Sequence, residues 1–321
     1  MVDILLATYN SEKHIKTLLD SLLNQSYRDL RIIISDDCST DSTAGILKEY
    51  EQKHKRLQVF YQQVNLGYIK NFEFLLCQST GEYVCFADHD DFWYSTKVET
   101  MLNELIRHKV DLVYCDMRQI DENGKVLAQS YMTLKDFPKI NGKNSMVVAF
   151  RHFSTGCSQL FSSIVLKKML PFKDCVIAHD WLSIFVASRA SGIHFIPKPL
   201  MDYRLHSGNV YGGKTTVENM IIAKAKYGKK YKGFLEYRKF VIDKNYLDGL
   251  KMCVAYTETD EPQLNKALKY FKSIRERNII SLKYISFYKY ALLGKQYKRS
   301  FKEFIMLHNP LMAYIYYSVK G

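Results

Sequence analysis

Four consecutive residues near the first third of the chain, Asp88-His89-Asp90-Asp91, carry three carboxylates. Carboxylates this close repel one another unless a cation or hydrogen-bond donors compensate their charge. Mg²⁺ and Mn²⁺ prefer oxygen ligands, commonly one or two carboxylates together with substrate phosphates. The cluster therefore suits a divalent metal on a diphosphate, although the same residues would also form a solvated turn that caps a helix beginning near Ser95.

Polar residues also follow three other strand-like stretches. Thr8-Tyr9-Asn10 comes after the first apolar run, Asp37 after three consecutive isoleucines, and Asn65-Leu66-Gly67 after a third run. Tyr9 could stack on a nucleobase beside a hydrogen bond from Thr8, and Asp37 could accept from the imide N–H of uracil or thymine. Each group could equally form a turn and cap the next helix.

The second half of the chain contains two shorter polar motifs. His179-Asp180-Trp181 opens a predicted helix, where an aspartate commonly acts as a cap but would also serve as the general base for an acceptor hydroxyl. Tyr203-Arg204-Leu205-His206 places a histidine in polar sequence. A lone histidine is more often structural than a metal ligand, but a core role is less natural in such a context.

Short apolar runs alternate with amphipathic stretches, which is the pattern of βαβ units and predicts an α/β fold. The expected strands are 2–7, 30–35, 57–62, 83–87, 112–115, 159–161 and 193–196. Helices are expected after a cap at Ser11 and at 39–54, 68–78, 97–108, 146–152 and 180–190, with an Asn123-Gly124 hairpin inside an irregular segment, 117–144. Since ligands gather at the carboxyl ends of strands in such sheets, we expect the polar groups to meet at one edge.

The net charge of +13 is concentrated in the C-terminal part of the chain. Residues 214–321 contain 22 lysines and arginines against 9 acidic residues, whereas the rest contains 24 of each. The composition changes near the same point, so we predict two domains, 1–210 and 211–321, the second mainly helical. Basic residues interleaved with tyrosine and phenylalanine suit an anionic membrane surface, but a helical domain with an aromatic core or a dimer contact would have the same composition.

Several other classes of protein are disfavoured by what the sequence lacks. It has no G-x-G-x-x-G and no G-x-x-x-x-G-K-[ST] pattern, which argues against dinucleotide and P-loop chemistry. A nucleic-acid partner would rest on the basic region alone, and we expect none. Seven cysteines without a C-x-x-C pair predict reduced thiols and a cytoplasmic protein. Neither a signal-peptide pattern nor an apolar run of about 20 residues is present.

Taken in order, the motifs resemble family 2 glycosyltransferases with the GT-A fold over about residues 1–210. The bacterial rhamnosyltransferase-like branch is the most similar pattern, with its D-x-D-D-x-W run, a later H-D-W and then Y-R-x-H. The resemblance implies a Rossmann-like mixed sheet flanked by helices, and an enzyme that transfers a sugar from a nucleotide-diphosphate donor. It rests on residues 7–10, 25–27, 35–41, 65–67, 88–93, 179–181 and 203–206.

The resemblance also implies a role for individual residues. The donor would contact Thr8, Tyr9, Asn10, Asp37, Asn65, Gly67, Lys70, Asn71 and Asp88. Mn²⁺ or Mg²⁺ would be held by Asp90 and His206, with Asp88 beside them. Asp180 would deprotonate the acceptor hydroxyl as it attacks the anomeric carbon, with inversion. Asp91 is expected to do no more than cap the following helix.

Two departures from the family pattern concern histidines: His89 stands inside the D-x-D, and His179 precedes the base where many relatives carry glutamate. The Q-x-x-R-W motif of processive relatives is absent, so single-sugar transfer is expected. The resemblance favours dTDP-rhamnose or a UDP-sugar as donor and a glycan or lipid-linked acceptor in bacterial cell-surface polysaccharide synthesis. It also suggests a peripheral position at the inner face of the plasma membrane. A sugar nucleotidyltransferase and a non-catalytic nucleotide-sugar or glycan binding protein are the alternatives.

Overall fold

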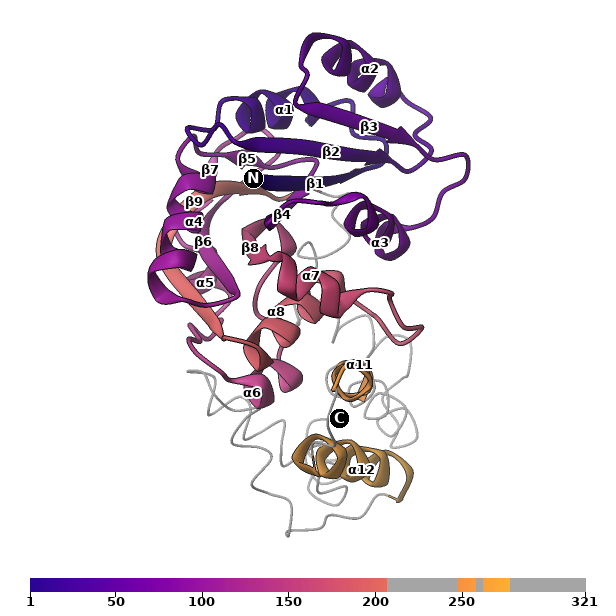
Figure 1. The fold of residues 1–321 in the computed structure, drawn as a ribbon, viewed down its shortest axis with the longest axis vertical. Coiled ribbons are helices and arrows are strands. Elements are labelled where there is room, and N and C mark those ends of the chain that lie inside the picture. The colour runs from indigo at the N-terminus through magenta and orange to yellow at the C-terminus, as the bar shows by residue number, and fades with distance from the viewer. Residues whose placement is uncertain (207–246, 258–261, 278–321) are drawn as a thin grey trace, which may run out of the picture. The chain divides into compact units, whose positions relative to one another are not determined.

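The computed structural model describes residues 1–206, 247–257 and 262–277 (Figure 1). Contacts divide the chain into two compact units. The first unit contains Met1–Val148 and Phe153–Leu205, and the second contains Ala149–His152 and His206–Gly321. The domain boundary near residue 210 stays a prediction. Within the described ranges, no helix has the length and apolar character needed to span a bilayer.

The first unit is built on a sheet of nine strands, which is mixed, as predicted. Its parallel half contains, in spatial order, β3 (Leu57–Tyr61), β2 (Leu30–Asp36), β1 (Val2–Thr8) and β4 (Tyr83–Asp88). The nearly continuous buried residues of β1 and β2 fit strands that are covered on both faces, whereas the edge strand β3 is partly exposed. The order continues through β8 (Gln159–Ser162), β6 (Leu112–Ile120), β9 (Ile193–Arg204) and β5 (Phe92–Trp93), while β7 (Val126–Ala128) pairs with β6. β8 runs antiparallel to both of its neighbours, β4 and β6.

Helices cover the parallel half of the sheet on both faces (Figure 1). The chain steps from β1 through β2 to β3 by way of α1 (Ile15–Leu23) and α2 (Thr43–Lys53), then returns to β4 by way of α3 (Tyr68–Gln78). Because crossovers between parallel strands are right-handed, the return places α3 on the opposite face from α1 and α2. The other helices of this unit are α4 (Lys97–His108), α5 (Tyr131–Leu134), α6 (Ser145–Phe150), which ends in the second unit, a 3₁₀ turn (Gly156–Ser158), α7 (Ser163–Met169) and α8 (His179–Arg189).

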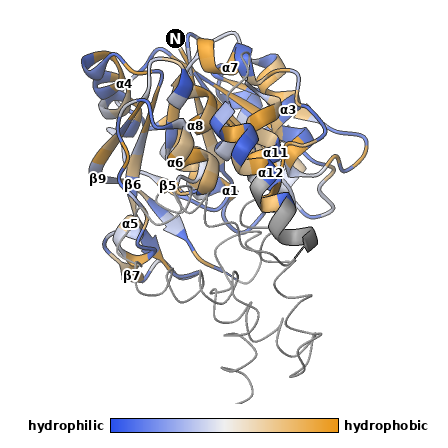
Figure 2. Cartoon of the chain, turned by 90° about the horizontal axis from the view of Figure 1, so that it is seen from below, coloured by the Kyte–Doolittle hydropathy of each residue, from blue (hydrophilic) through white to orange (hydrophobic). Residues whose placement is uncertain are grey.

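Helix α8 is buried almost all round, with Leu182, Ile184, Phe185 and Ala187 fully enclosed. A helix that is apolar on every side belongs inside a core. Figure 2 contrasts this largely hydrophobic helix with the more hydrophilic α4, which buries only one stripe of its surface. The N-terminus of α8, which carries His179 and Asp180, is therefore fixed by packing along the rest of the helix.

The structure corrects several predicted boundaries. β6 continues from Cys115 to Ile120, through residues expected to be irregular, because it pairs with β9 along its length. β9 continues past Ile196 by a register shift that absorbs Pro197 and Lys198, and proline is tolerated at such irregularities because it cannot donate to the ladder. The short strand β5 and the helix α7 were not predicted.

Two turn predictions had different outcomes. The Asn123-Gly124 hairpin is confirmed, since β6 and β7 are antiparallel and Gly124 has φ 86°. The predicted cap at Ser11 is wrong in detail. Ser11 lies in a turn before α1, where its carbonyl accepts from the backbone N–H of His14 and Ile15, and the helix itself begins at Ile15.

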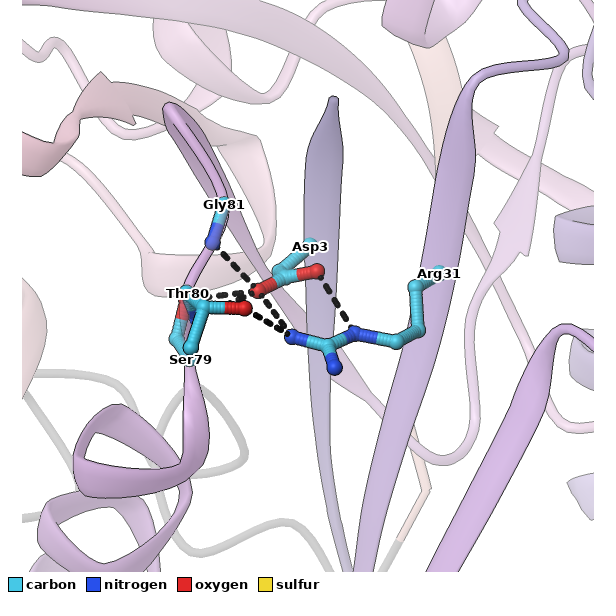
Figure 3. Close-up of polar contacts among 5 residues, drawn as sticks. All are labelled: Asp3, Arg31, Ser79, Thr80 and Gly81. Atoms are coloured by element: carbon cyan, nitrogen blue, oxygen red, sulfur yellow. Dashed lines mark hydrogen bonds and ion pairs between the residues drawn. The ribbon is translucent and has the colours of Figure 1, made fainter.

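A buried ion pair joins three elements at the amino end of the parallel strands (Figure 3). Asp3 is fully buried in β1 and accepts from the Nε and Nη2 atoms of Arg31 on β2 at 3.0 and 2.8 Å. It also accepts from Ser79, Thr80 and Gly81, which follow α3, at 2.8–3.0 Å. Burial opposes ionisation of this carboxyl, but the hydrogen bonds from Arg31 and its neighbours prevail and lower its pKa. This network fixes the register of β1 and β2 with the turn that leads into β4.

The second unit contains two described helices, α11 (Asp248–Ala255) and α12 (Pro262–Arg277). Leu250, Cys253, Leu264 and Phe271 are buried in it, and the rings of Phe150 and Phe271 lie 5.9 Å apart. The helical prediction for 211–321 is therefore met by these two segments, while the rest of that prediction falls outside the described residues.

Candidate active site at the carboxyl ends of the strands

The predicted polar groups do meet at one edge of the sheet. Thr8 at the end of β1 is in register with Asp36 at the end of β2, and Ala7 is in register with Asp88 at the end of β4. The loops that follow these strands therefore begin side by side along one edge of the sheet. This arrangement confirms the expectation drawn from strand ends.

The loop after β1 is bound tightly to the loop after β2. Asn10 has φ 48°, and its backbone N–H donates to Ser39 Oγ at 2.9 Å. Its side-chain oxygen accepts from the backbone N–H of Thr40 at 2.8 Å. Ser11 donates its backbone N–H to Thr43 Oγ1 at 2.7 Å, and Thr8 Oγ1 lies 2.6 Å from Ser11 Oγ. The two loops thus form one preorganised surface, in which Tyr9 is 45 % exposed.

Asp37 organises a third loop. Its carboxylate oxygens accept from the backbone N–H of Leu66 at 2.7 Å and of Gly67 at 2.9 Å. Its carbonyl accepts from Asn65 Nδ2 at 3.0 Å. Gly67 has φ 77°, in the left-handed region that favours glycine. Asp37 therefore shapes the Asn65-Leu66-Gly67 loop, and its predicted contact with a base would use the remaining lone pairs of the same carboxylate.

The two remaining predicted donor residues lie on α3, at different depths. Lys70 is exposed and pairs with Glu73 at 2.7 Å. Asn71 is 1 % exposed, and its Nδ2 donates to the carbonyl of Ser35 at 3.2 Å, at the end of β2. In this structure Asn71 supports the edge of the sheet from beneath, and Lys70 is the more accessible of the two.

Three carboxylates of the acidic cluster lie close enough to perturb one another. Asp88 is partly exposed, whereas Asp90 and Asp91 are buried. Burial, the charge of Asp90 and that of Asp180 raise the pKa of Asp88 to about 7, against donation by Cys157. Burial and the charges of Asp90 and Asp88 raise the pKa of Asp91 well above its usual range. The grouping of Asp88, Asp90 and Asp180, predicted from distant motifs, is thus present.

Asp91 does not cap α4, contrary to prediction, since that helix begins at Lys97 after Thr96. Its Oδ1 instead accepts from the backbone N–H of Arg204 at 3.1 Å. The guanidinium of Arg204 donates to the carbonyls of Asp90, Asp121 and Glu122 at 2.9–3.2 Å. Arg204 thereby fixes the acidic loop against the end of β9. The Y-R-x-H motif predicted a metal ligand at His206 and gave no signal for this structural role of Arg204.

A buried lysine lies beneath the acidic cluster. Lys97 is fully buried; its Nζ donates to the carbonyl of Cys157 at 2.5 Å and lies 3.3 Å from the centre of the Trp93 ring. Burial lowers its pKa, while nearby groups that include Asp91 act in the opposite direction. The Cys157 thiol, whose pKa burial raises well above the usual range, approaches Asp88 and Asp91. Neither Lys97 nor Cys157 stands in a pattern that marks a site, so sequence reasoning missed both.

Asp180 is held in place by backbone donors. Its Oδ2 accepts from the N–H of Gly156 at 3.0 Å and its Oδ1 from the N–H of Trp181 at 2.8 Å. Gly156 can approach this closely because it has no side chain: a Cβ atom there would lie 2.9 Å from His179 Nε2 and 3.4 Å from Asp180 Cβ. Asp180 is partly exposed and near Asp88, which suits a general base beside a donor site.

His179 belongs to an aromatic cluster. Its ring stacks on Phe72 with centres 3.8 Å apart and meets the edge of Phe86 at 4.6 Å. It is 6 % exposed. This packing explains why a histidine precedes the aspartate: the ring anchors the first turn of α8 against α3 and β4.

A divalent cation fits the acidic cluster on a direct observation. Asp91 Oδ2 is completely buried with no donor stronger than the Cys157 thiol, and burial together with the mutual repulsion of Asp88, Asp90 and Asp91 raises the pKa values of Asp88 and Asp91. A hard cation would relieve both costs. His206, the other predicted ligand, belongs to the second unit, and its role stays a prediction.

Comparison with known proteins agrees with this geometry. The profile of glycosyl transferase family 2 matches residues 3–168. The chain is 29 % identical to the dTDP-rhamnosyl transferase RfbG of Shigella flexneri over 240 residues, which cover 69 % of this chain and 76 % of that protein. It is 32 % identical over 127 residues to TuaG of Bacillus subtilis, which is named a putative teichuronic acid biosynthesis glycosyltransferase, covering 40 % of this chain and 50 % of that one.

Two solved structures share the fold. S. aureus TarS in complex with UDP-GlcNAc aligns with a TM-score of 0.57 at 18 % identity, covering 91 % of this chain and 79 % of that one. The mannosyltransferase PcManGT of Pyrobaculum calidifontis, solved with GDP-Man and Mn²⁺, aligns with a TM-score of 0.55 at 16 % identity, covering 99 % and 86 %. The mixed sheet, the row of polar strand ends and the family match together show that this chain is a glycosyltransferase with the GT-A fold and belongs to glycosyl transferase family 2.

Proposed function

We propose that this glycosyltransferase is metal-dependent and inverting, and that it transfers one sugar from a nucleotide-diphosphate donor to a hydroxyl of a glycan or lipid-linked acceptor. The observation that carries the proposal is the convergence of Asp88, Asp90 and Asp180, from two distant segments, at the carboxyl ends of the strands. Because Asp88 and Asp90 follow one strand while Asp180 opens α8, the first pair suits the donor diphosphate and the last the acceptor.

The donor would bind along the preorganised loops. Tyr9 offers an exposed ring for the base, Asp37 an acceptor for its imide, and Asp88 a contact to the donor. Relatives support a deoxyhexose or hexose donor, because RfbG is described as a dTDP-rhamnosyl transferase and TarS was solved with UDP-GlcNAc. We therefore propose dTDP-rhamnose or a UDP-sugar, used in bacterial cell-surface polysaccharide synthesis, as the name of TuaG also suggests.

In the proposed reaction, the acceptor oxygen attacks the anomeric carbon from the side opposite the diphosphate. A new carbon–oxygen bond forms as the bond to the diphosphate oxygen breaks, and the configuration inverts. Asp180 takes the proton of the acceptor hydroxyl, and the nucleoside diphosphate leaves with the bond electrons. Asp90 and Asp88, with His206, would hold Mn²⁺ or Mg²⁺, which when bound supplies charge neutralisation at the diphosphate. Gly156 and Trp181 keep the base oriented through their backbone N–H groups.

Two variants separate the proposed roles. Asp180→Asn keeps the size of the base but removes its basicity, so we expect unchanged donor binding and a loss of transfer of about 100-fold or more. Asp90→Ala should abolish the dependence of donor binding on Mn²⁺. Glu49→Gln, which removes an exposed carboxylate on α2, is the matched control and should change neither property.

The assay is a panel of nucleotide sugars with Mn²⁺ or Mg²⁺, read as donor binding by calorimetry and as release of nucleoside diphosphate. Transfer preserved in Asp180→Asn would remove it as the base. Donor binding and turnover that do not respond to metal or to Asp90→Ala would refute the metal assignment. Pyrophosphate release in place of nucleoside diphosphate would instead indicate a nucleotidyltransferase.

We further propose that residues 214–321 bring the enzyme to an anionic membrane surface at the inner face of the plasma membrane, where a lipid-linked acceptor would lie. Each basic residue near such a surface contributes about 1 kcal/mol. Sedimentation with anionic vesicles at low salt tests this, and no binding would refute it. Analytical ultracentrifugation distinguishes the alternative, in which the same region makes a homodimer.

A further inference from the structure

Three metal-binding side chains converge outside the candidate active site. Glu104 and His108 lie one turn apart on α4, and His194 is the second residue of β9. Their ligand atoms all lie within 4.8 Å of one another. Arg204, which touches the acidic cluster, lies at the other end of β9, ten residues further along. At roughly 3.3 Å per residue in a strand, the two places are on the order of 30 Å apart.

The distances match a shared metal ion. Glu104 Oε2 lies 3.2 Å from His108 Nε2 and 3.6 Å from His194 Nε2. Tetrahedral zinc has bonds of about 2.0–2.2 Å to nitrogen and oxygen, which gives about 3.4 Å between neighbouring ligand atoms. These separations are compatible with one shared ion once an imidazole ring reorients towards it.

The surroundings of the cluster leave a neutral imidazole and a free carboxylate oxygen for a cation. Burial and the neighbouring His108 lower the pKa of His194, which leaves its imidazole neutral and able to bind a metal at neutral pH. The two imidazole rings are stacked, with centres 3.6 Å apart and planes 17° apart, so their in-plane lone pairs run nearly parallel, and one ring must turn out of the stack before both Nε2 atoms bind one ion. Arg107 Nη1 lies 3.4 Å from Glu104 Oε1 and leaves the other oxygen turned towards the histidines.

We propose that Glu104 Oε2, His108 Nε2 and His194 Nε2 bind Zn²⁺ or a related transition-metal ion, with water as the fourth ligand. Two imidazoles and one carboxylate suit zinc, whereas Mg²⁺ prefers oxygen ligands alone. The side chain of His108 is 36 % exposed, that of His194 19 % and that of Glu104 25 %, so an ion has access from solvent. Its binding would cross-link α4 to β9. This proposal does not rest on the proposed transfer reaction.

Zinc titration of the full chain, by calorimetry in excess Mg²⁺, tests the site. We expect one equivalent of Zn²⁺ to bind the wild type, with an affinity at least about 100-fold weaker in His108→Ala and in His194→Ala, since loss of an outer-shell partner alone costs 10–100-fold. His54→Ala, which removes a partly exposed histidine at the C-terminal end of α2, is the matched control and should bind like wild type. Titration with Co²⁺ should give the visible absorption of a tetrahedral complex in the same proteins.

Asp91→Asn identifies binding at the other cluster, because Asp88, Asp91 and Cys157 also lie close together. Zinc binding that survives in both histidine variants but disappears in Asp91→Asn would overturn the proposal. Equal zinc affinity in wild type and both histidine variants would overturn it as well. His108 is the most exposed of the three ligands, so His108→Ala should keep the melting temperature of the metal-free protein, and loss of zinc binding in that variant cannot be attributed to unfolding.

Discussion

Replacement of Asp3 by asparagine should destabilise the first unit strongly, although the residue lies far from the candidate active site. The wild-type carboxylate is fully buried and accepts five hydrogen bonds, two of them from Arg31. In Asp3→Asn, the amide keeps the shape but loses the charge, and its NH₂ group must face donors. Arg31 is 29 % exposed and can partly regain water, so the cost falls near the lower end of the range for a broken buried pair, about 3 kcal/mol.

Thermal unfolding at pH 7, read by circular dichroism, measures this effect. For a domain of this size each kcal/mol shifts Tm by about 2–4 °C, so we expect a decrease of roughly 6–12 °C. Glu49→Gln removes a carboxylate whose pair with Lys53 is exposed on both sides, and it should change Tm by less than about 2 °C. A decrease in Asp3→Asn no larger than in this control would refute the role given to the network.

The same network has a defined pH dependence. The pKa of Asp3 is lower in the folded protein than in the unfolded chain, so its contribution is complete above the unfolded value of about 3.9 and is lost as pH falls through the folded value. The stability difference between wild type and Asp3→Asn should therefore be constant near neutral pH and shrink below about pH 4. A difference that stays constant down to pH 2 would contradict this explanation.

Two further predictions concern the candidate active site. Gly156→Ala should lower transfer by about 10-fold or more with little loss of donor binding, because the added Cβ would displace His179 and the proposed base, Asp180. Gly45→Ala, where the added atom meets open space, is the control. Equal activity in the two variants would refute the positioning argument. Metal-free protein should lose stability as pH rises from about 4 to about 7, since the pKa of Asp88 is raised to about 7 in the folded state and its ionisation there is unfavourable. Mn²⁺ should restore that stability, which a thermal-shift series across this pH range with and without Mn²⁺ measures. No recovery with Mn²⁺ would show that the acidic cluster binds no cation.

Local patterns predicted the parallel half of the sheet well, because strands such as Leu30–Asp36 are buried on both faces and read as continuous apolar runs. The second half was harder. β9 was expected to end before Pro197, yet pairing with β6 carries it to Arg204, and the two-residue strand β5 exists only because it pairs with β9. Tertiary pairing of this kind leaves no periodic signal in one segment.

The candidate site likewise contains residues that local motifs predicted and residues whose role only the tertiary structure reveals. Each of Asp88, Asp90 and Asp180 could equally cap a helix when taken alone, and they were predicted as site residues because the order of their motifs resembles family 2 glycosyltransferases. Lys97 was not found, since a lysine in an amphipathic helix is normally solvated, and only the fold shows it buried against Trp93. Cys157 likewise becomes relevant only when the turn that carries it lies beside the acidic loop.

The seam between β4 and β8, where parallel pairing changes to antiparallel, has a consequence for how this enzyme diversifies. Apart from Asp88 at the end of β4, every residue proposed to contact the donor directly precedes that seam in the chain, whereas Gly156, Asp180 and the proposed metal ligands Asp90 and His206 follow β4. If the proposed roles hold, substitutions in the later segments would alter which acceptor is used, while the loops proposed to contact the base would be inherited intact. Exchange of the later segments between related enzymes would be expected to transfer acceptor choice, with donor choice remaining that of the parent supplying the first four strands.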